Sequence, residues 1–199
     1  MKSPFVSEVE RHLDALAETA SRAARELAGT VAEVAEMVLH AIDAGGTLFF
    51  CGNGGSAADA QHLATEYVVR FRRNRHALPA VALTTDTSLL TAASNDFGFE
   101  HVFARQVRAL AGAGDILFLH STSGRSPNLL EAARAARDVG ARTVALLGGD
   151  GGPLREAVDV AIVVPTADGA HAQELHLAIG HAICDIVESR LAGHGTGEY

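Results

Sequence analysis

Large aromatic side chains and cysteines are scarce in this sequence. It has no tryptophan and two cysteines, and aromatic residues make up 5% of its 199 residues. Alanine, valine and leucine must therefore fill the interior, which favours helices packed closely on a sheet. Two cysteines cannot form a disulfide framework. Because Cys51 and Cys184 stand in apolar segments, we expect both to be buried free thiols.

Long apolar runs and a secretion signal are also missing. No apolar segment is long enough to cross a bilayer, and residues 1–5 lack the apolar core of a signal peptide. We therefore expect a cytoplasmic protein with no membrane partner. Positive charge is in short supply as well, because 16 Lys and Arg against 24 Asp and Glu give a net charge of −8. Nucleic-acid binding needs a basic surface, so that class of partner is not expected.

Short apolar runs alternate with helical segments along most of the chain. The runs are continuously apolar and lie near residues 47–51, 80–83, 115–120, 143–147 and 160–164. This pattern predicts an α/β fold with five strands in a parallel sheet that helices bury on both faces. We divide the chain into N-terminal helices (1–44), the α/β domain (45–192) and a flexible glycine-rich tail (193–199).

The N-terminal segment has the periodicity of one or two amphipathic helices. Its apolar face packs either on its own domain or on a second subunit, and periodicity alone does not separate these alternatives.

Two loops that follow a strand and precede a helix are suited to bind an anion, because parallel sheets bind ligands at the carboxyl ends of their strands. Residues 121–126 bring four hydroxyl groups to a helix N-terminus, which makes a cradle for a phosphate. Ser126 would also suit the N-cap, with Pro127 as the first helical residue. The glycine-rich loop 52–56 allows close approach of backbone N–H groups, or is simply a tight turn. It matches a dinucleotide fingerprint only loosely, so we expect no nucleotide cofactor.

Titratable residues recur at helical spacing in two places. His62 and Glu66 are four residues apart and share one helix face. They could bind a metal, act as acid and base, or form a simple surface pair. Gln173 and His181 share one side of the last helix, where His181 could equally be a partly buried packing residue.

Four motifs, in order and with similar spacing, resemble those of the sedoheptulose 7-phosphate isomerase family. They are CGNGGSAADAQH at 51–62 with Glu66, NDFGF at 95–99, STSGRS at 121–126, and the segment from Gln173 to His181. The resemblance covers about residues 45–190 and implies a sugar isomerase (SIS) domain, a flavodoxin-like three-layer αβα sandwich. It further implies a homotetramer with active sites at subunit interfaces. The implied reaction converts D-sedoheptulose 7-phosphate, a phosphorylated seven-carbon sugar, to D-glycero-D-manno-heptose 7-phosphate.

The resemblance also implies roles for individual residues. Glu66 and His181 correspond to the general base and acid of a ketose–aldose isomerisation through an enediol. A divalent metal, usually zinc, would be held by His62, Glu66, Gln173 and His181. The positions that correspond to the substrate and phosphate site are Asn53, Gly54, Gly55, Ser56, Asp96, Ser121, Thr122, Ser123, Ser126 and Gln173.

The sequence departs from the family in two places that bear on the site. Residues 170–172 are Ala-His-Ala where the family commonly has Asp-Arg-Ile, and Arg125 stands where Asn is common. The alternative to an enzyme is a non-catalytic SIS-domain protein that binds a replication initiator or senses a phosphosugar. The presence of both Glu66 and His181 favours the enzyme, because the replication regulator lacks that pair.

Overall fold

The computed structural model describes residue 3 and residues 5–191, and the glycine-rich tail expected at 193–199 lies outside them. One parallel sheet forms the centre, with strand order β2-β1-β3-β4-β5. This order is that of flavodoxin-like domains, so the predicted fold class is confirmed. The strands are β1 (Leu48–Gly52), β2 (Ala80–Ala82), β3 (Ile116–Ser121), β4 (Arg142–Leu147) and β5 (Val160–Val163).

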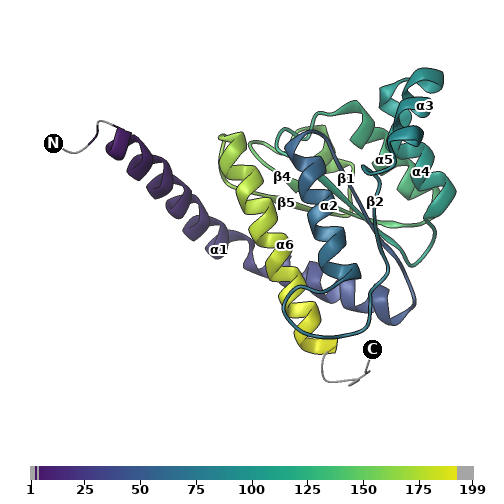
Figure 1. The fold of residues 1–199 in the computed structure, drawn as a ribbon, viewed down its shortest axis with the longest axis horizontal. Helices are drawn as coiled ribbons and strands as arrows, with labels where there is room; N and C mark the ends of the chain where they lie inside the picture. Colours follow the sequence, from purple (N-terminus) through teal and green to yellow (C-terminus); the bar gives the residue numbers. More distant parts are fainter. Residues whose placement is uncertain (1–2, 4, 192–199) are drawn as a thin grey trace.

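Helices cover the sheet on both faces (Figure 1). The α-helices are α1 (Phe5–Asp43), α2 (Gly55–Val68), α3 (Thr87–Phe97), α4 (Val102–Leu110), α5 (Pro127–Val139) and α6 (Gly169–Leu191). Two short 3-10 helices, η1 (Phe99–His101) and η2 (Pro153–Glu156), complete the described elements. Among the helices of residues 5–191, none is both long and apolar enough to cross a membrane.

Alternate residues of each strand face opposite helical layers. In β1, Leu48 and Phe50 belong to the core shared with α1, α2 and α6, whereas Phe49 and Cys51 belong to the core shared with α3, α4 and α5. Because both faces are buried, every residue of β1 and β3 is apolar or enclosed, which explains the continuous apolar runs in the sequence. Cys51 and Cys184 are buried and free, as expected.

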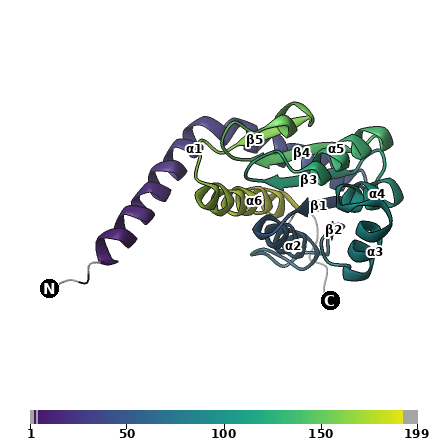
Figure 2. The same cartoon turned by 90° about the horizontal axis from the view of Figure 1, so that it is seen from above.

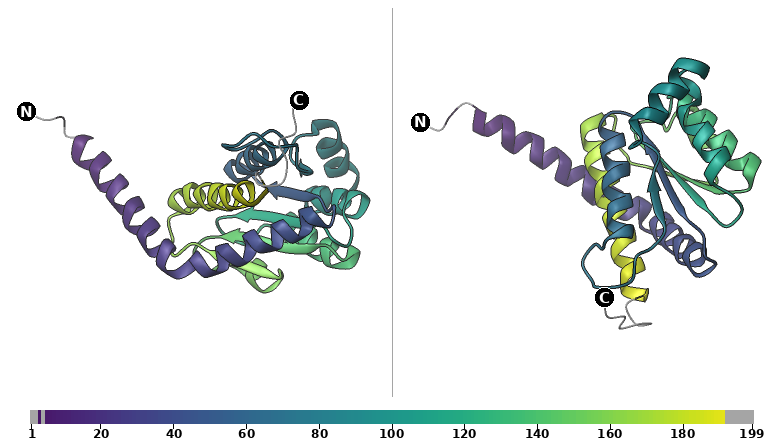
Figure 3. Two further views of the ribbon diagram at one scale, coloured as in Figure 1. Left: turned by 90° about the horizontal axis from the view of Figure 1, so that it is seen from below. Right: turned by 45° about the vertical axis from the view of Figure 1, so that its right-hand side comes forward.

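Helix α1 is one continuous helix with two different environments. Val34 and Val38, in its second half, are fully buried against the sheet. Its first turns project away from the domain, as Figures 2 and 3 show from two sides, and leave Phe5, Val9 and Leu13 exposed. From Leu16 onward the helix therefore packs on its own domain. The turns before it carry the apolar stripe Phe5, Val9 and Leu13, which no described residue covers.

Helix α2 ends at Val68, earlier than the apolar pattern alone suggests. The buried carboxylate of Glu188 accepts hydrogen bonds from the backbone N–H groups of Phe71, Arg72 and Arg73, at 2.7–3.0 Å. Burial alone would raise the pKa of Glu188, but these N–H groups and Arg75 hold it below its usual value. A turn built around a carboxylate of α6 therefore replaces the last turn of the helix.

Candidate active site

Two helices that lie side by side, α2 and α6, bring together the titratable residues singled out in the sequence (Figure 3). The Nε2 atoms of His62 and His181 are 2.9 Å apart, and His62 Nε2 lies 3.2 Å from a carboxylate oxygen of Glu66. The helices can approach this closely at Gly180, where a Cβ atom would meet Leu63 Cδ2 at 2.6 Å. His62, Glu66 and His181 thus form one cluster, in which each residue offers a ligand atom within 4.8 Å of the others.

The surroundings of His181 favour its neutral form. Burial lowers its pKa most, and the neighbouring His62 and Arg72 lower it further, while Glu66 opposes them. Phe71 stacks on the His181 ring, with centroids 5.0 Å apart, and fixes its orientation. A neutral imidazole beside a carboxylate can either donate a proton or bind a metal ion through nitrogen.

The described residues fit a zinc ion in this cluster by the chemistry of their donors. Two imidazole nitrogens and one carboxylate oxygen form a ligand set that zinc accepts. Gln173, the fourth residue of the predicted metal set, lies about two turns from His181 along α6. Its amide packs against Gly55, where a Cβ would come within 2.3 Å, and its Nε2 is 3.5 Å from Asp59 Oδ1. The structure therefore brings three of the four predicted ligands into mutual contact and seats Gln173 against the glycine-rich loop.

The hydroxyl-rich loop follows β3 as predicted and ends at the N-terminus of α5. Ser121 is buried, and its Oγ accepts a hydrogen bond from the Gly124 N–H at 2.9 Å, which fixes the curl of the loop. Ser126 occupies the N-cap position of α5 without making a side-chain cap bond. Its hydroxyl is therefore not used by the helix. Thr122 lies near the start of α6, where a Cβ atom added to Gly169 would come within 3.6 Å of its hydroxyl oxygen.

The end of the glycine-rich loop is tied to the same helix N-terminus. Asn53 and Asn128, the second residue of α5, exchange two hydrogen bonds of 2.9 and 2.8 Å. Arg125 does not add free positive charge to the loop, because its guanidinium pairs with Asp150 at 2.6 Å. The loops after β1 and β3 thus form one continuous polar edge at the carboxyl end of the sheet.

Asp96 is not part of the His62 cluster within one chain. It is exposed on α3, in the helical layer on the opposite face of the sheet from α2 and α6. Its carboxylate accepts a hydrogen bond from the Asn95 side chain at 2.8 Å and lines a cavity of about 340 Å³ with Leu89 and Arg105.

Three features near the site were absent from the sequence predictions. Asp59 is buried beside Gln173, and burial raises its pKa. It precedes His62 by three residues on α2, so helical spacing could have indicated it. Asn128 was hidden because its role depends on the pairing of β1 with β3. The third feature is His120, the residue just before the hydroxyl-rich loop, which is fully buried and packs against Phe50 and His176.

Comparison with known proteins shows the family to which this fold belongs. The family model of the SIS domain matches residues 11–148. The class is therefore that of SIS-domain proteins. A phosphoheptose isomerase from Geobacter sulfurreducens is 54% identical over 167 residues, which are 84% of this chain and 88% of the relative. One from Roseiflexus sp. is 48% identical over 194 residues, 96% of this chain and 98% of the relative.

A solved structure adds the same result in three dimensions. The phosphoheptose isomerase of Neisseria gonorrhoeae aligns with a TM-score of 0.89 at 42% sequence identity, covering 93% of this chain and 99% of that one. The chain belongs to the phosphoheptose isomerase family. The family resemblance stated from the four motifs is thereby confirmed.

Proposed function

We propose that this protein is an aldose–ketose isomerase that converts D-sedoheptulose 7-phosphate to D-glycero-D-manno-heptose 7-phosphate. The observation that carries the proposal is the convergence of Glu66 with His181 across two helices. The names of the relatives, at about half identity over most of the chain, support the same activity. The anionic substrate does not cross a bilayer unaided, which supports the cytoplasmic location expected from the sequence.

In the proposed mechanism Glu66 is the base and His181 is the acid. Glu66 removes a proton from C1 of the ketose while the carbonyl oxygen at C2 gains one from His181, which gives the enediol. Glu66 then returns its proton to C2, and the O1 hydroxyl gives a proton back to His181, which leaves an aldose. The number of protons on the two residues is the same before and after turnover, as an isomerase requires.

The same cluster suits a divalent metal, and zinc is our proposal for it. His62, Glu66, Gln173 and His181 would hold the ion. Because a group bound to the metal does not transfer a proton at the same time, Glu66 and His181 would act in turn as ligands and as base and acid. When bound, a zinc ion stabilises negative charge on the substrate oxygens as a Lewis acid. No nucleotide cofactor is part of the proposal.

Substrate binding is assigned to the polar edge at the carboxyl ends of β1 and β3. The N-terminus of α5 and the hydroxyls of Ser121, Thr122, Ser123 and Ser126 would bind the phosphate. The residues proposed to contact the sugar or phosphate from the first loop and α6 are Asn53, Gly54, Gly55, Ser56 and Gln173. Anchoring the phosphate holds a flexible acyclic sugar with its reacting carbons near the base.

Assembly into a homotetramer is proposed with the site at a subunit interface. The exposed apolar stripe Phe5, Val9 and Leu13 on the N-terminal segment (1–44) supports a role in oligomerisation, because exposed apolar patches mark interfaces. Asp96 lies in the helical layer opposite the His62 cluster, so it would reach a site only from a neighbouring subunit.

The test is turnover of sedoheptulose 7-phosphate by the wild type, Glu66→Gln and a matched control, Glu156→Gln. Glu156 is an exposed glutamate in η2 whose carboxylate lies 3.9 Å from Arg155 Nε, and it is no part of the His62 cluster. Because general acid–base catalysis contributes about 10²- to 10⁴-fold, Glu66→Gln should lower kcat by that factor while the control stays near wild type. Absence of turnover in the wild type, both with and without added zinc, would overturn the proposal.

A further inference from the structure

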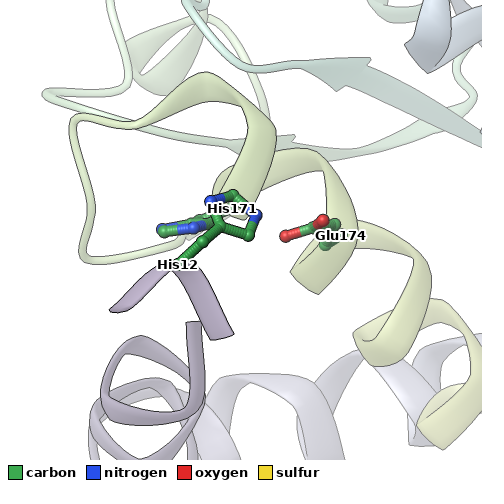
Figure 4. Close-up of side chains that lie close together, drawn as sticks. All are labelled: His12, His171 and Glu174. Carbon is green, nitrogen blue, oxygen red and sulfur yellow. The ribbon is translucent and has the colours of Figure 1, made fainter. Parts of the chain in front are cut away.

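A second group of potential metal ligands lies apart from the proposed catalytic cluster. Figure 4 shows His12 of α1 beside His171 of α6, with the carboxylate of Glu174 turned towards the same place. The ring centroids of the two histidines are 4.7 Å apart. Each of the three residues offers a ligand atom within 4.8 Å of the others.

His171 is the member of this group that most needs a partner. Its side chain is buried, with the residue only 5% exposed, and its Nε2 atom has no hydrogen-bond partner among the described residues. A buried polar nitrogen without a partner is uncommon in folded proteins and calls for an explanation such as an ion. His12 and Glu174 are exposed, so an ion could enter from solvent.

The positions of these side chains are held by well-packed helices. His171 and Glu174 are three residues apart on α6 and so share one face. The Asp168 carboxylate caps α6 by accepting hydrogen bonds from the N–H groups of Ala170 and His171, at 2.8 and 3.3 Å. Its other oxygen lies 3.9 Å from His171 Nδ1. The carboxylate thus faces the imidazole without a direct hydrogen bond, and rotation of the Asp168 side chain would let it orient the ring, as carboxylates do beside metal-binding histidines.

Helix α1 is fixed next to α6 just beyond His12. Leu16, Ala20 and Ala23 pack with Leu175 in a small apolar cluster of their own. Two ligands therefore come from α6 and one from α1, and both helices are anchored within about a turn of the site. Sites built on rigid elements hold their ligands more precisely than sites on loops.

We propose that His12, His171 and Glu174 bind a divalent transition-metal ion of the zinc type. Two imidazoles and one carboxylate suit zinc, whereas calcium and magnesium prefer all-oxygen sites. With metal–ligand bonds of about 2.0–2.1 Å, tetrahedral ligands lie roughly 3.3 Å apart. The exposed side chains of His12 and Glu174 can close the remaining gap by rotation, and a water molecule completes the coordination.

The bound ion would tie the projecting first turns of α1 to the start of α6. His171 falls within residues 170–172, the segment that differs from the Asp-Arg-Ile common in the family. The ion would act as a structural clamp one residue away from Gln173, at the edge of the proposed active site.

The test measures zinc binding to tag-free, full-length protein in which His62→Ala and His181→Ala have removed the catalytic cluster. After chelation and dialysis against zinc, elemental analysis should find about one zinc ion per chain. Adding His12→Ala should abolish this binding, whereas adding His76→Ala, at an exposed histidine elsewhere, should leave it unchanged. Asp168→Asn should weaken it by about 10- to 100-fold, as loss of an orienting carboxylate does.

Cobalt substitution supplies a second readout that is independent of catalysis. Cobalt bound to the His62→Ala/His181→Ala protein should give visible d–d absorption that disappears on adding His12→Ala. Absence of bound metal while His12 is intact, or equal binding after His12→Ala, would overturn the proposal. Neither outcome depends on isomerase activity, so this proposal and the proposed function fail separately.

Discussion

The buried histidines behind the hydroxyl-rich loop make the stability of the protein depend on pH. Burial and the nearby His176 lower the pKa of His120 to about 3, and burial lowers that of His176 to about 4. Their rings pack 6.3 Å apart, and His120 also lies against Phe50. In the unfolded chain both would titrate near 6.5.

These pKa values set the direction in which stability changes with pH. Because the folded pKa lies below the unfolded value, the unfolded chain binds protons first as the pH falls. The stability that each neutral histidine contributes is complete above about pH 6.5 and is lost as the pH falls towards 3–4. At about pH 5 the loss is roughly 2 kcal/mol for each histidine, or about 4 kcal/mol for both.

Urea unfolding, followed by circular dichroism at about pH 7.5 and about pH 5, measures this loss. We compare the wild type with His120→Leu, which removes one titrating ring at similar volume, and with His76→Leu, at an exposed histidine, as the control. The difference in unfolding free energy between the two pH values should shrink by about 2 kcal/mol in His120→Leu only. An equal pH dependence in all three proteins would refute the reasoning.

Three further substitutions test other parts of the structure. Gly180→Ala places a Cβ 2.6 Å from Leu63 Cδ2. Because this distance is far below van der Waals contact, we expect a cost in the upper part of the overpacking range of about 1–3 kcal/mol, which exceeds the gain of about 1 kcal/mol in helix propensity. The unfolding free energy in urea should fall by roughly 1–2 kcal/mol, and unchanged stability would contradict the close packing. Ser126→Ala should raise KM about tenfold, because the phosphate loses a hydrogen bond from this hydroxyl. The value of kcat and the stability should stay unchanged, since the hydroxyl makes no cap bond in the helix. An unchanged KM would argue against phosphate binding by Ser126. Glu188→Gln leaves the buried Arg75 with a neutral partner. The unfolding free energy in the same assay should fall by about 3 kcal/mol or more. A fall of less than about 1 kcal/mol would show that the ion pair does not stabilise the fold.

Much of the fold could be predicted because its strands are buried on both faces. Continuous apolar runs are the direct result of that burial, so all five strands were found to within a residue or two. The position where α2 ends was harder to predict. The turn after Val68 depends on Glu188, more than a hundred residues later in the chain, and no local pattern around residues 68–73 reveals that contact.

The site could be predicted only in part, because some of its contacts are local in sequence and others are not. His62 with Glu66 is a local pattern on one helix, but the contact of His62 with His181 spans 119 residues and needs the packing of α2 on α6. Only the family resemblance connected them in advance. His12 and His171 lie still farther apart in sequence, and no motif joins them, so their contact could be found only in three dimensions.

The central claim is that Glu66 moves a proton between C1 and C2 of a phosphorylated ketose. The most direct measurement is the reaction of sedoheptulose 7-phosphate in deuterium oxide, followed by nuclear magnetic resonance of the product. The proton that Glu66 takes from C1 exchanges with the solvent while the enediol is bound. The enediol mechanism therefore predicts an aldose phosphate that carries solvent deuterium at C2, formed by the wild type and about 10²-fold or more slowly by Glu66→Gln. Formation of that product at equal rates by both proteins, or no aldose phosphate from the wild type, would contradict the account.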